Sequence, residues 1–158
     1  MITHAPPDYR SPFLDVVEGL EPPSTLTKQS DVFYRDAELT AFISSHRYQK
    51  PSGNALIVPN EPYENLYTIP DDLLCAVHRL SKRLASAFKT VYRCDGVLMR
   101  QHNEPAGSQD VWHYHLHVIP RFENDDFYAA LPQKILTTSA EREPYARKLR
   151  AYFEGTST

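Results

Sequence analysis

Three histidines recur at every second position in the segment 111–119. They are His113, His115 and His117. The segment is rich in apolar and aromatic residues and is typical of a strand, in which alternate side chains share one face. The opposite face would carry Trp112, Tyr114, Leu116 and Val118, which could join the core. A row of imidazoles makes a poor core because each buried ring nitrogen needs a hydrogen-bond partner. We therefore expect the histidine face of this strand to be a functional site, with a solvent-exposed strand face of no special function as the alternative.

Two kinds of chemistry suit three imidazoles on one face. Neutral imidazoles could ligate zinc and leave a fourth position open, as in hydrolytic metal sites. Alternatively, one imidazole attacks phosphorus and the others handle phosphate and protons, which suits a side chain whose pKa lies near neutrality. The preceding segment 101–110 favours the second alternative, because Asn103, Ser108 and Gln109 offer donors for anionic oxygens that a zinc site does not need.

The remaining sequence predicts the elements that must position this strand. Apolar periodicity and turn residues predict helices over 11–19, 71–92 and 139–153, and strands over 32–34, 39–44, 55–58, 96–101 and 111–119. Thr68 or Asp71 could cap the long helix. This order indicates an α+β fold with an antiparallel sheet of about five strands, one long helix and terminal helices. We expect a flexible arm over 1–10 and a single domain over 11–158, with its core over 11–122 and a helical tail over 123–158.

Composition narrows the class of protein further. The chain of 158 residues suits one domain with its own core. A formal net charge of −3 argues against a nucleic-acid wrapper, so we expect no nucleic-acid polymer as a partner. No apolar run approaches the roughly 20 residues that span a bilayer, and no signal peptide is recognisable. Cys75 and Cys94 are too few for a disulfide framework. We expect two reduced thiols in a cytoplasmic protein with no membrane partner.

The histidine stretch resembles the signature of the histidine triad (HIT) superfamily. The stretch His113-Tyr114-His115-Leu116-His117-Val118-Ile119 fits the family's alternation of histidine and apolar residues, and its flanks fit as well. The segments 11–17, 41–43 and 54–59 are similar to further family segments, so the resemblance covers about residues 11–122, roughly 70% of the chain. It implies a HIT-like α+β fold, commonly a homodimer in which two sheets run together.

The resemblance also implies an activity and residue roles. Family members hydrolyse or transfer nucleoside monophosphates from dinucleoside polyphosphates or phosphoramidates, with no metal in the covalent step. His115 would be the nucleophile at the α-phosphorus, while His113 and His117 would hold phosphate oxygens and help protonate the leaving group. Asn103 and Gln109 would contact phosphate. The base and ribose pocket would be lined by Phe13, Phe42 and Ile43.

The chain departs from the family pattern at several positions. Ser44 stands where the family has a ribose-binding Asp, and Asn54 stands where it has a supporting His. Asp110 replaces a Ser or Thr, so we expect it to turn away from phosphate, to pair with Arg100 or Arg121, or to orient an imidazole.

Two further expectations concern metal binding and His102. The bacterial relatives' Cys-x-x-Cys zinc pair is replaced by Ser11 and Leu14, so we expect no structural zinc. His102 is expected in a surface or supporting role, with a place facing the triad as the alternative. Because of the departures, a non-catalytic nucleotide-binding module also stays open as an alternative to the enzyme.

Overall fold

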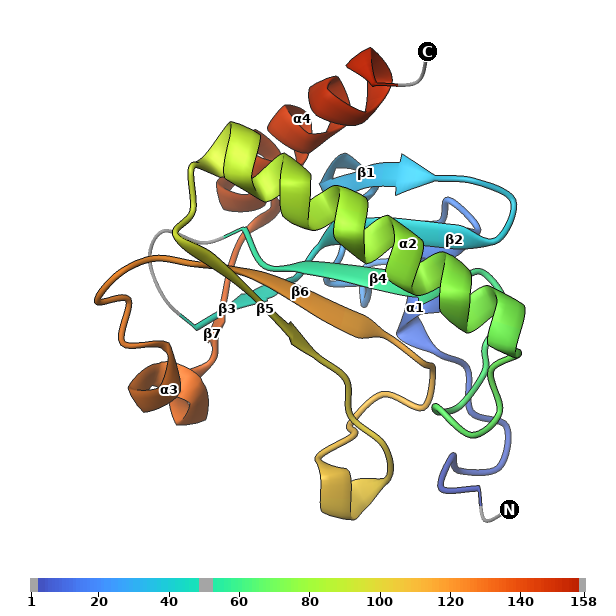
Figure 1. Cartoon of the computed structure of the whole chain (residues 1–158). Coiled ribbons are helices and arrows are strands. Elements are labelled where there is room, and N and C mark those ends of the chain that lie inside the picture. Colours follow the sequence, from blue (N-terminus) through green and yellow to red (C-terminus); the bar gives the residue numbers. More distant parts are fainter. Residues whose placement is uncertain (1–2, 49–52, 157–158) are drawn as a thin grey trace.

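The computed structural model describes residues 3–48 and 53–156 and has an α+β architecture (Figure 1). The strands are β1 (Val32–Arg35), β2 (Leu39–Ile43), β3 (His46–Arg47), β4 (Ala55–Pro59), β5 (Gly96–Arg100), β6 (Leu116–Arg121) and β7 (Ile135–Leu136). The α-helices are α1 (Pro12–Val17), α2 (Asp71–Ala87), α3 (Phe127–Ala130) and α4 (Ser139–Gly155). Shorter helical turns are η1 (Gln29–Asp31), η2 (Phe88–Tyr92), η3 (Pro105–Gly107) and η4 (Leu131–Gln133).

Five strands form one sheet in the order β1-β2-β4-β6-β5, and every neighbouring pair is antiparallel. This confirms the predicted α+β fold class with an antiparallel sheet of about five strands. The sequence did not predict α3 or the second sheet, in which β3 pairs with β7. These two strands are two residues long, which is too short for a recognisable periodic pattern.

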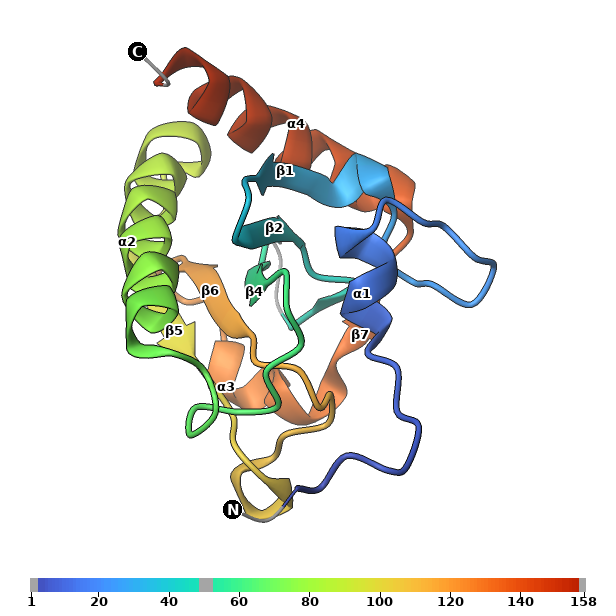
Figure 2. The same ribbon diagram turned by 90° about the vertical axis from the view of Figure 1, so that its right-hand side faces the viewer.

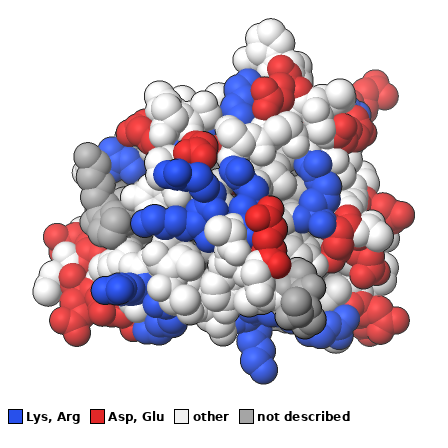
Figure 3. Space-filling model, turned by 90° about the horizontal axis from the view of Figure 1, so that it is seen from above, with Lys and Arg blue, Asp and Glu red and all other residues white. Residues whose placement is uncertain are grey.

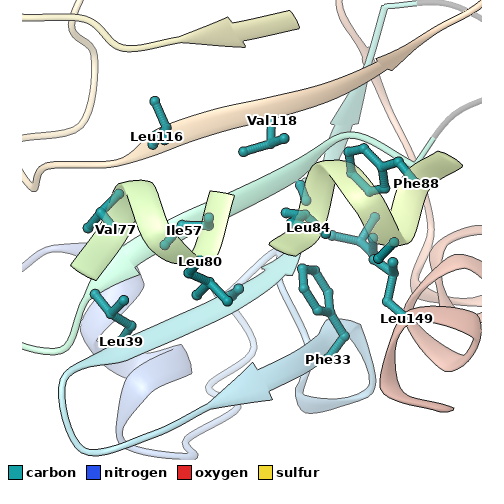
Figure 4. Packing of buried hydrophobic residues seen from close by; sticks show 14 of the residues in the cluster. Phe33, Leu39, Ile57, Val77, Leu80, Leu84, Phe88, Leu116, Val118 and Leu149 are labelled. Atoms are coloured by element: carbon teal, nitrogen blue, oxygen red, sulfur yellow. The ribbon is translucent and has the colours of Figure 1, made fainter. Parts of the chain in front are cut away.

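One face of the sheet is closed by α2 and α4. Val77, Leu80 and Leu84 recur at three- and four-residue steps on α2 and are buried against the sheet (Figure 4). The cluster includes Leu116 and Val118 of β6 and Leu149 of α4. This is a conventional apolar core covered by two long helices.

The opposite face is covered by α1 and by loops, and Figure 2 shows α1 and α2 on different sides of the sheet. Phe42, Leu56 and Val58 point to this face and pack with Phe13 and Val16 of α1. Their neighbours Ala41, Ile43, Ala55 and Ile57 belong to the core under α2. The period of two along each strand therefore sorts adjacent residues into two different environments.

Several predicted boundaries are wrong. Strand β6 begins at Leu116, so His113 precedes the strand rather than lying within it. Trp112 is half-buried outside the core and stacks on His4 at a ring distance of 5.8 Å. The long helix begins after Pro70 and has no side-chain cap, so the predicted cap at Thr68 or Asp71 is also wrong. The Thr68 hydroxyl donates to the carbonyl of Asn65 instead.

The predicted flexible arm makes specific contacts over residues 3–10. The backbone N–H of His4 donates to the carboxylate of Glu64 at 2.8 Å. The Tyr9 hydroxyl accepts a hydrogen bond from the backbone N–H of Trp112 at 3.2 Å. A segment held by polar contacts lacks the apolar periodicity from which order is predicted, which explains why the sequence predicts a flexible arm here.

The surface of α2 is charged, and the two cysteines lie in different environments. The basic residues Arg79, Lys82 and Arg83 of α2 are exposed, and Figure 3 shows Lys and Arg side chains interspersed with acidic ones on this side of the molecule. Cys75 is exposed, Cys94 is buried, and neither forms a disulfide. Within the residues the structure describes, no helix combines the length and apolar character that crossing a membrane requires.

Candidate functional site

A cavity of about 570 Å³ opens on the face of the sheet opposite α2, next to the histidine segment. The lining comes from segments that lie far apart in the sequence: Pro12, Phe13, Ser24, Thr25, Leu26, Thr27, Ser44, Ser45, His46, Tyr48, Leu56, Arg100, His102, Ser108, Asp110, Val111, His115, His117, Leu131, Pro132 and Lys134. A cavity of this size accommodates a small molecule. The combination of imidazoles, cations and apolar walls suits an anionic ligand with an apolar part.

His115 lines the cavity in a single defined tautomer. Its Nδ1 lies 2.7 Å from the backbone carbonyl of His113. Because a carbonyl only accepts hydrogen bonds, Nδ1 carries the proton and Nε2 keeps its lone pair. The edge of the Phe13 ring contacts the imidazole at a centroid distance of 5.2 Å and holds its plane. The fold therefore holds His115 with Nε2 unprotonated, which is the form that a nucleophile needs.

His113 lies behind the cavity, where both ring nitrogens have protein partners. Its Nε2 donates to the carbonyl of Pro59 at 2.9 Å, so its Nδ1 accepts from the Ser11 hydroxyl at 3.0 Å. Ser11 in turn accepts from the backbone N–H of Phe13 and caps α1. The predicted phosphate-holding role of His113 has no support in this geometry, because neither nitrogen is available. His113 instead supplies the carbonyl that orients His115.

His117 and His102 complete a row of imidazoles along the cavity wall. The ring of His117 lies 5.0 Å from that of His115 and 5.8 Å from that of His102. His102 donates from Nδ1 to the carbonyl of Gly107 at 2.7 Å, so Nε2 is its accepting nitrogen. The alternative considered for His102, a fourth imidazole facing the triad, is therefore the one that the structure supports.

Burial keeps the triad neutral at physiological pH. Desolvation lowers the pKa of His113 to about 4, and a hydrogen bond to Pro59 offsets part of this effect. Burial also lowers the pKa of His115, with the His113 carbonyl and Asp110 acting in the opposite direction. The pKa of His117 lies well below its usual value because of burial, followed by the neighbouring imidazoles and cations. Neutral imidazoles have the lone pair that attack on phosphorus requires.

Asn103 and Gln109 brace the loop before the triad instead of lining the cavity. The Gln109 amide donates to the carbonyls of Glu64 and Val111 and accepts from the backbone N–H of Glu104. Glu104 has φ 61° and ψ 165°, a strained conformation for a residue with a side chain, and the Gln109 contact holds it there. Asn103 exchanges amide hydrogen bonds with a neighbour and accepts from a backbone N–H. Phosphate contact by either residue stays a prediction.

The predicted base and ribose residues fall in three different places. Phe13 and Ser44 line the cavity. Phe42 is fully buried behind Phe13, with ring centroids 5.6 Å apart. Ile43 belongs to the core under α2, so the prediction that it lines the pocket is wrong. The physical reason is the strand period, since adjacent residues cannot point to the same face.

Asp110 lines the cavity mouth, and Asn54 lies buried at the start of β4. The Asp110 carboxylate pairs with Lys134 at 3.3 Å, so the predicted pairing with Arg100 or Arg121 is wrong. Arg121 pairs with Asp125 instead. Neither amide atom of Asn54 has a hydrogen-bond partner within residues 3–48 and 53–156. The supporting role expected of Asn54 therefore stays a prediction.

Sequence reasoning named Arg100 only as a possible partner of Asp110 and did not name Lys134, yet both cations line the cavity. Arg100 stands opposite His117 in the pairing of β5 with β6, and Lys134 reaches the cavity from the segment after η4. The strand register and the return of the chain near residue 134 leave no local sequence signal. His46 of β3 and Tyr48, which follows this strand, also line the cavity.

The three-histidine zinc alternative finds no supporting geometry. Nowhere in the described ranges do three or more His, Cys, Asp or Glu side chains come together as a metal-binding group. The two nitrogens of His113 are engaged by Ser11 and Pro59, so neither offers a free lone pair to a metal ion. Ser11 serves as the cap of α1.

Comparisons with known proteins agree with this architecture. The family described as HIT domain matches residues 25–124. Protein hit of Bacillus subtilis is 29% identical over 98 residues, which cover 62% of this chain and 66% of that protein. Adenosine 5'-monophosphoramidase HNT1 of Saccharomyces cerevisiae is 38% identical over 69 residues, which cover 44% of this chain and 41% of that protein. The chain thus spans less than two thirds of the length of these relatives.

A solved structure extends the likeness to nearly the whole chain. The crystal structure of a Hit-like protein from Bartonella henselae superimposes with a TM-score of 0.77 at 28% identity, covering 91% of this chain and 96% of that one. The domain match, the imidazole row and the sheet order together identify the chain as a member of the HIT domain family.

Proposed function

We propose that this protein is a nucleotidyl hydrolase or transferase that acts on nucleoside-monophosphate conjugates through a covalent intermediate on His115. One observation carries the proposal. The His113 carbonyl fixes the proton of His115 on Nδ1, so the lone pair of Nε2 is free in an imidazole that lines a cavity. The HIT relative from yeast is named an adenosine 5'-monophosphoramidase, which agrees with this class of chemistry.

The first step transfers the nucleotide to the protein. Nε2 of His115 forms a bond to the α-phosphorus, the bond from phosphorus to the leaving atom breaks, and the leaving atom keeps the electron pair. His117, the neighbouring imidazole, is neutral and can donate one N–H to a phosphate oxygen. Two cationic residues, Arg100 and Lys134, also line the cavity, which suits an anionic substrate.

The second step releases the nucleotide. A water molecule attacks the phosphorus, the N–P bond breaks, and Nε2 of His115 recovers its electron pair while a water proton passes to solvent. Protonation of a nitrogen-linked phosphate at neutral pH makes the imidazole a good leaving group. If another nucleophile replaces water, the same intermediate leads to nucleotidyl transfer. We propose that neither step requires a metal ion.

Intact-mass spectrometry after rapid quench tests the proposal. The protein is mixed with diadenosine triphosphate and, separately, with adenosine phosphoramidate, and the reaction is stopped within milliseconds. We expect an adduct with the mass of a nucleoside monophosphate in wild-type protein and no adduct in His115→Asn. Nucleotide binding without adduct or turnover on a panel of AMP and GMP conjugates would instead favour a non-catalytic binding module.

We also propose a homodimer formed through the free edge of β5. This strand ends the five-stranded sheet, and Met99 on it is 48% exposed. An open strand edge with an apolar side chain is a template for pairing with a second sheet. Light scattering coupled to gel filtration should give twice the chain mass for wild type and the single-chain mass for Met99→Lys. A monomeric wild type would contradict the dimer without affecting the proposed chemistry.

A further inference from the structure

One wall of the cavity carries a positive charge without a counter-charge. Arg100 lies at the end of β5, directly across from His117, and lines the cavity. Its Nη1 is buried and lacks a hydrogen-bond partner among the described residues, and no carboxylate in those ranges is within ion-pair distance. A buried charge without a partner is costly. An anion bound in the cavity would supply the missing partner.

The other charged groups do not neutralise Arg100. Asp110 is engaged with Lys134 across the cavity mouth, so these two charges offset each other. The three triad imidazoles are held neutral by burial. The net charge that the cavity offers to a ligand therefore comes from Arg100, at the end of the imidazole row that begins with His115.

His102 holds the guanidinium of Arg100 in place. Nη2 of Arg100 donates to Nε2 of His102 at 3.1 Å, and Nδ1 of His102 donates to the carbonyl of Gly107 at 2.7 Å. This chain fixes both the tautomer of His102 and the direction of Arg100. The ring of Tyr48 lies 6.0 Å from the guanidinium and covers it. An Arg fixed by these two neighbours is organised for binding before a ligand arrives.

We propose that Arg100, oriented by His102, binds a phosphate of the leaving group, so that the protein prefers conjugates whose leaving group is itself a phosphate over those that release an amine. This inference rests on the proposed function at His115. When Nε2 of His115 bonds to the α-phosphorus, the bridging P–O bond breaks and its electron pair stays on the departing phosphate oxygen. The charge that grows there is offset by Arg100. An amine leaving group offers no such charge, so Arg100 contributes little to its release.

The test compares two leaving groups on one nucleotide. We measure kcat/KM for diadenosine triphosphate and for adenosine phosphoramidate with wild type, Arg100→Gln and the matched control Arg79→Gln, which removes the same charge from an exposed site on α2. Loss of a charge-assisted hydrogen bond predicts a fall of about 10- to 100-fold on the triphosphate for Arg100→Gln. We expect a change below about 3-fold on the phosphoramidate and no change for Arg79→Gln on either substrate.

His102 has its own test as a positioning residue. His102→Ala should lower kcat/KM on the triphosphate by about 5-fold and spare the phosphoramidate, because Arg100 keeps its charge but loses its orientation. His102→Gln keeps an acceptor for Nη2 and should recover most of the loss. A loss of the same size on both substrates would assign His102 a structural role instead.

A binding measurement separates the two proposals. Titration calorimetry with inorganic tripolyphosphate should give a Kd about 10-fold weaker for Arg100→Gln than for wild type. If wild type turns over neither substrate, the proposed function at His115 is wrong. If Arg100→Gln loses activity equally on both substrates, or binds tripolyphosphate as tightly as wild type, the role of Arg100 is wrong and the chemistry at His115 stands.

Discussion

The two faces of the five-stranded sheet are made by the same strands but are covered in different ways. On one face, α2 and α4 close a continuous apolar cluster that includes Leu84, Val118 and Leu149. On the other face, the six-residue α1 and several loops leave a cavity lined by His115 and His117. Adjacent residues of β6 thus belong to opposite environments, with Leu116 in the core and His117 at the cavity.

This difference indicates that one face contributes mainly to stability and that the other carries the polar cavity. Apolar burial under two helices supplies most of the free energy of folding. The cavity face keeps buried imidazoles and a guanidinium that has no carboxylate partner among the described residues, and such groups lower stability. This separation predicts that substitutions on the two faces affect different measurements.

The largest effect is expected at the cavity face from His115→Ala. Removal of the attacking nitrogen should lower kcat by at least about 10⁴-fold, as for other enzymes that lose their nucleophile. The free energy of unfolding should change by less than about 1 kcal/mol, because the buried imidazole loses one hydrogen bond and its desolvation cost together. Steady-state kinetics and urea unfolding of the same preparation check both halves. Turnover near the wild-type rate would refute the covalent mechanism.

The opposite pattern is expected for Leu84→Ala on the core face. Leu84 is fully buried between α2 and the sheet, so the substitution leaves a cavity and should lower the free energy of unfolding by about 3 kcal/mol. The kcat of the folded protein should stay within about 2-fold of wild type, since Leu84 lies on the other side of the sheet from His115. A large loss of kcat at full folding would show that the two faces are coupled.

Stability should depend on pH through the cavity face, and His113 is one of the residues that contribute to this dependence. The pKa of His113 is 6.5 in the unfolded chain and about 4 in the folded protein, so the unfolded chain binds more protons between these values. Stability is therefore full above pH 6.5 and falls by on the order of 3 kcal/mol as the pH drops to 4. Urea unfolding at pH 7, 5.5 and 4.5 measures the slope.

His113→Gln provides the control for this pH dependence. Glutamine can still donate to the Pro59 carbonyl but cannot titrate. The variant should have a shallower dependence on pH than wild type, while carboxylates contribute equally to both proteins. Identical slopes of stability against pH for the two proteins would contradict a neutral buried His113.

The lowered pKa of His115 predicts a second effect of pH, on activity. The acid limb of the pH profile of kcat/KM should lie below pH 6.5.

The sequence predicted the core face more completely than the cavity face. The helical periodicity of Val77, Leu80 and Leu84 identifies the buried side of α2 without knowledge of any partner. Alternation along 113–118 likewise separates imidazoles from core residues even though β6 begins at Leu116. Both are local patterns. A local pattern is sufficient to predict the buried residues of an element when that element packs against one broad apolar layer.

The cavity depends on contacts between distant segments, which a single sequence does not encode locally. Arg100 reaches His117 through the register of β5 and β6, and Lys134 reaches Asp110 because the chain returns after α3. Asn103 has the residue type of a phosphate ligand, yet its amide is engaged within its own loop. Residue type alone cannot distinguish a ligand-binding amide from one that braces a loop.

A smaller effect is expected where α1 meets the triad. Ser11→Ala removes the cap of α1 and leaves Nδ1 of His113 without its donor, which should cost about 2 kcal/mol of stability. The matched control is Thr138→Ala, which removes a similar cap from α4 at an exposed site and should cost about 1 kcal/mol. Because α1 carries Phe13 against His115, kcat/KM should fall a few-fold for Ser11→Ala alone. Equal costs in chemical unfolding would argue against the link from Ser11 to His113.

The smallest effect is expected for the ion pair at the cavity mouth. The side chains of Asp110 and Lys134 are 67% and 50% exposed, so solvent screens their attraction and the pair should contribute less than about 1 kcal/mol. A double-mutant cycle with Asp110→Asn and Lys134→Gln measures this coupling by urea unfolding, and it should weaken further in 0.5 M salt, where the screening length is about 4 Å. A coupling above about 2 kcal/mol would mean that this exposed ion pair contributes to stability as strongly as a buried contact in the core. The difference in stability contribution between the two faces would then not hold at the cavity mouth.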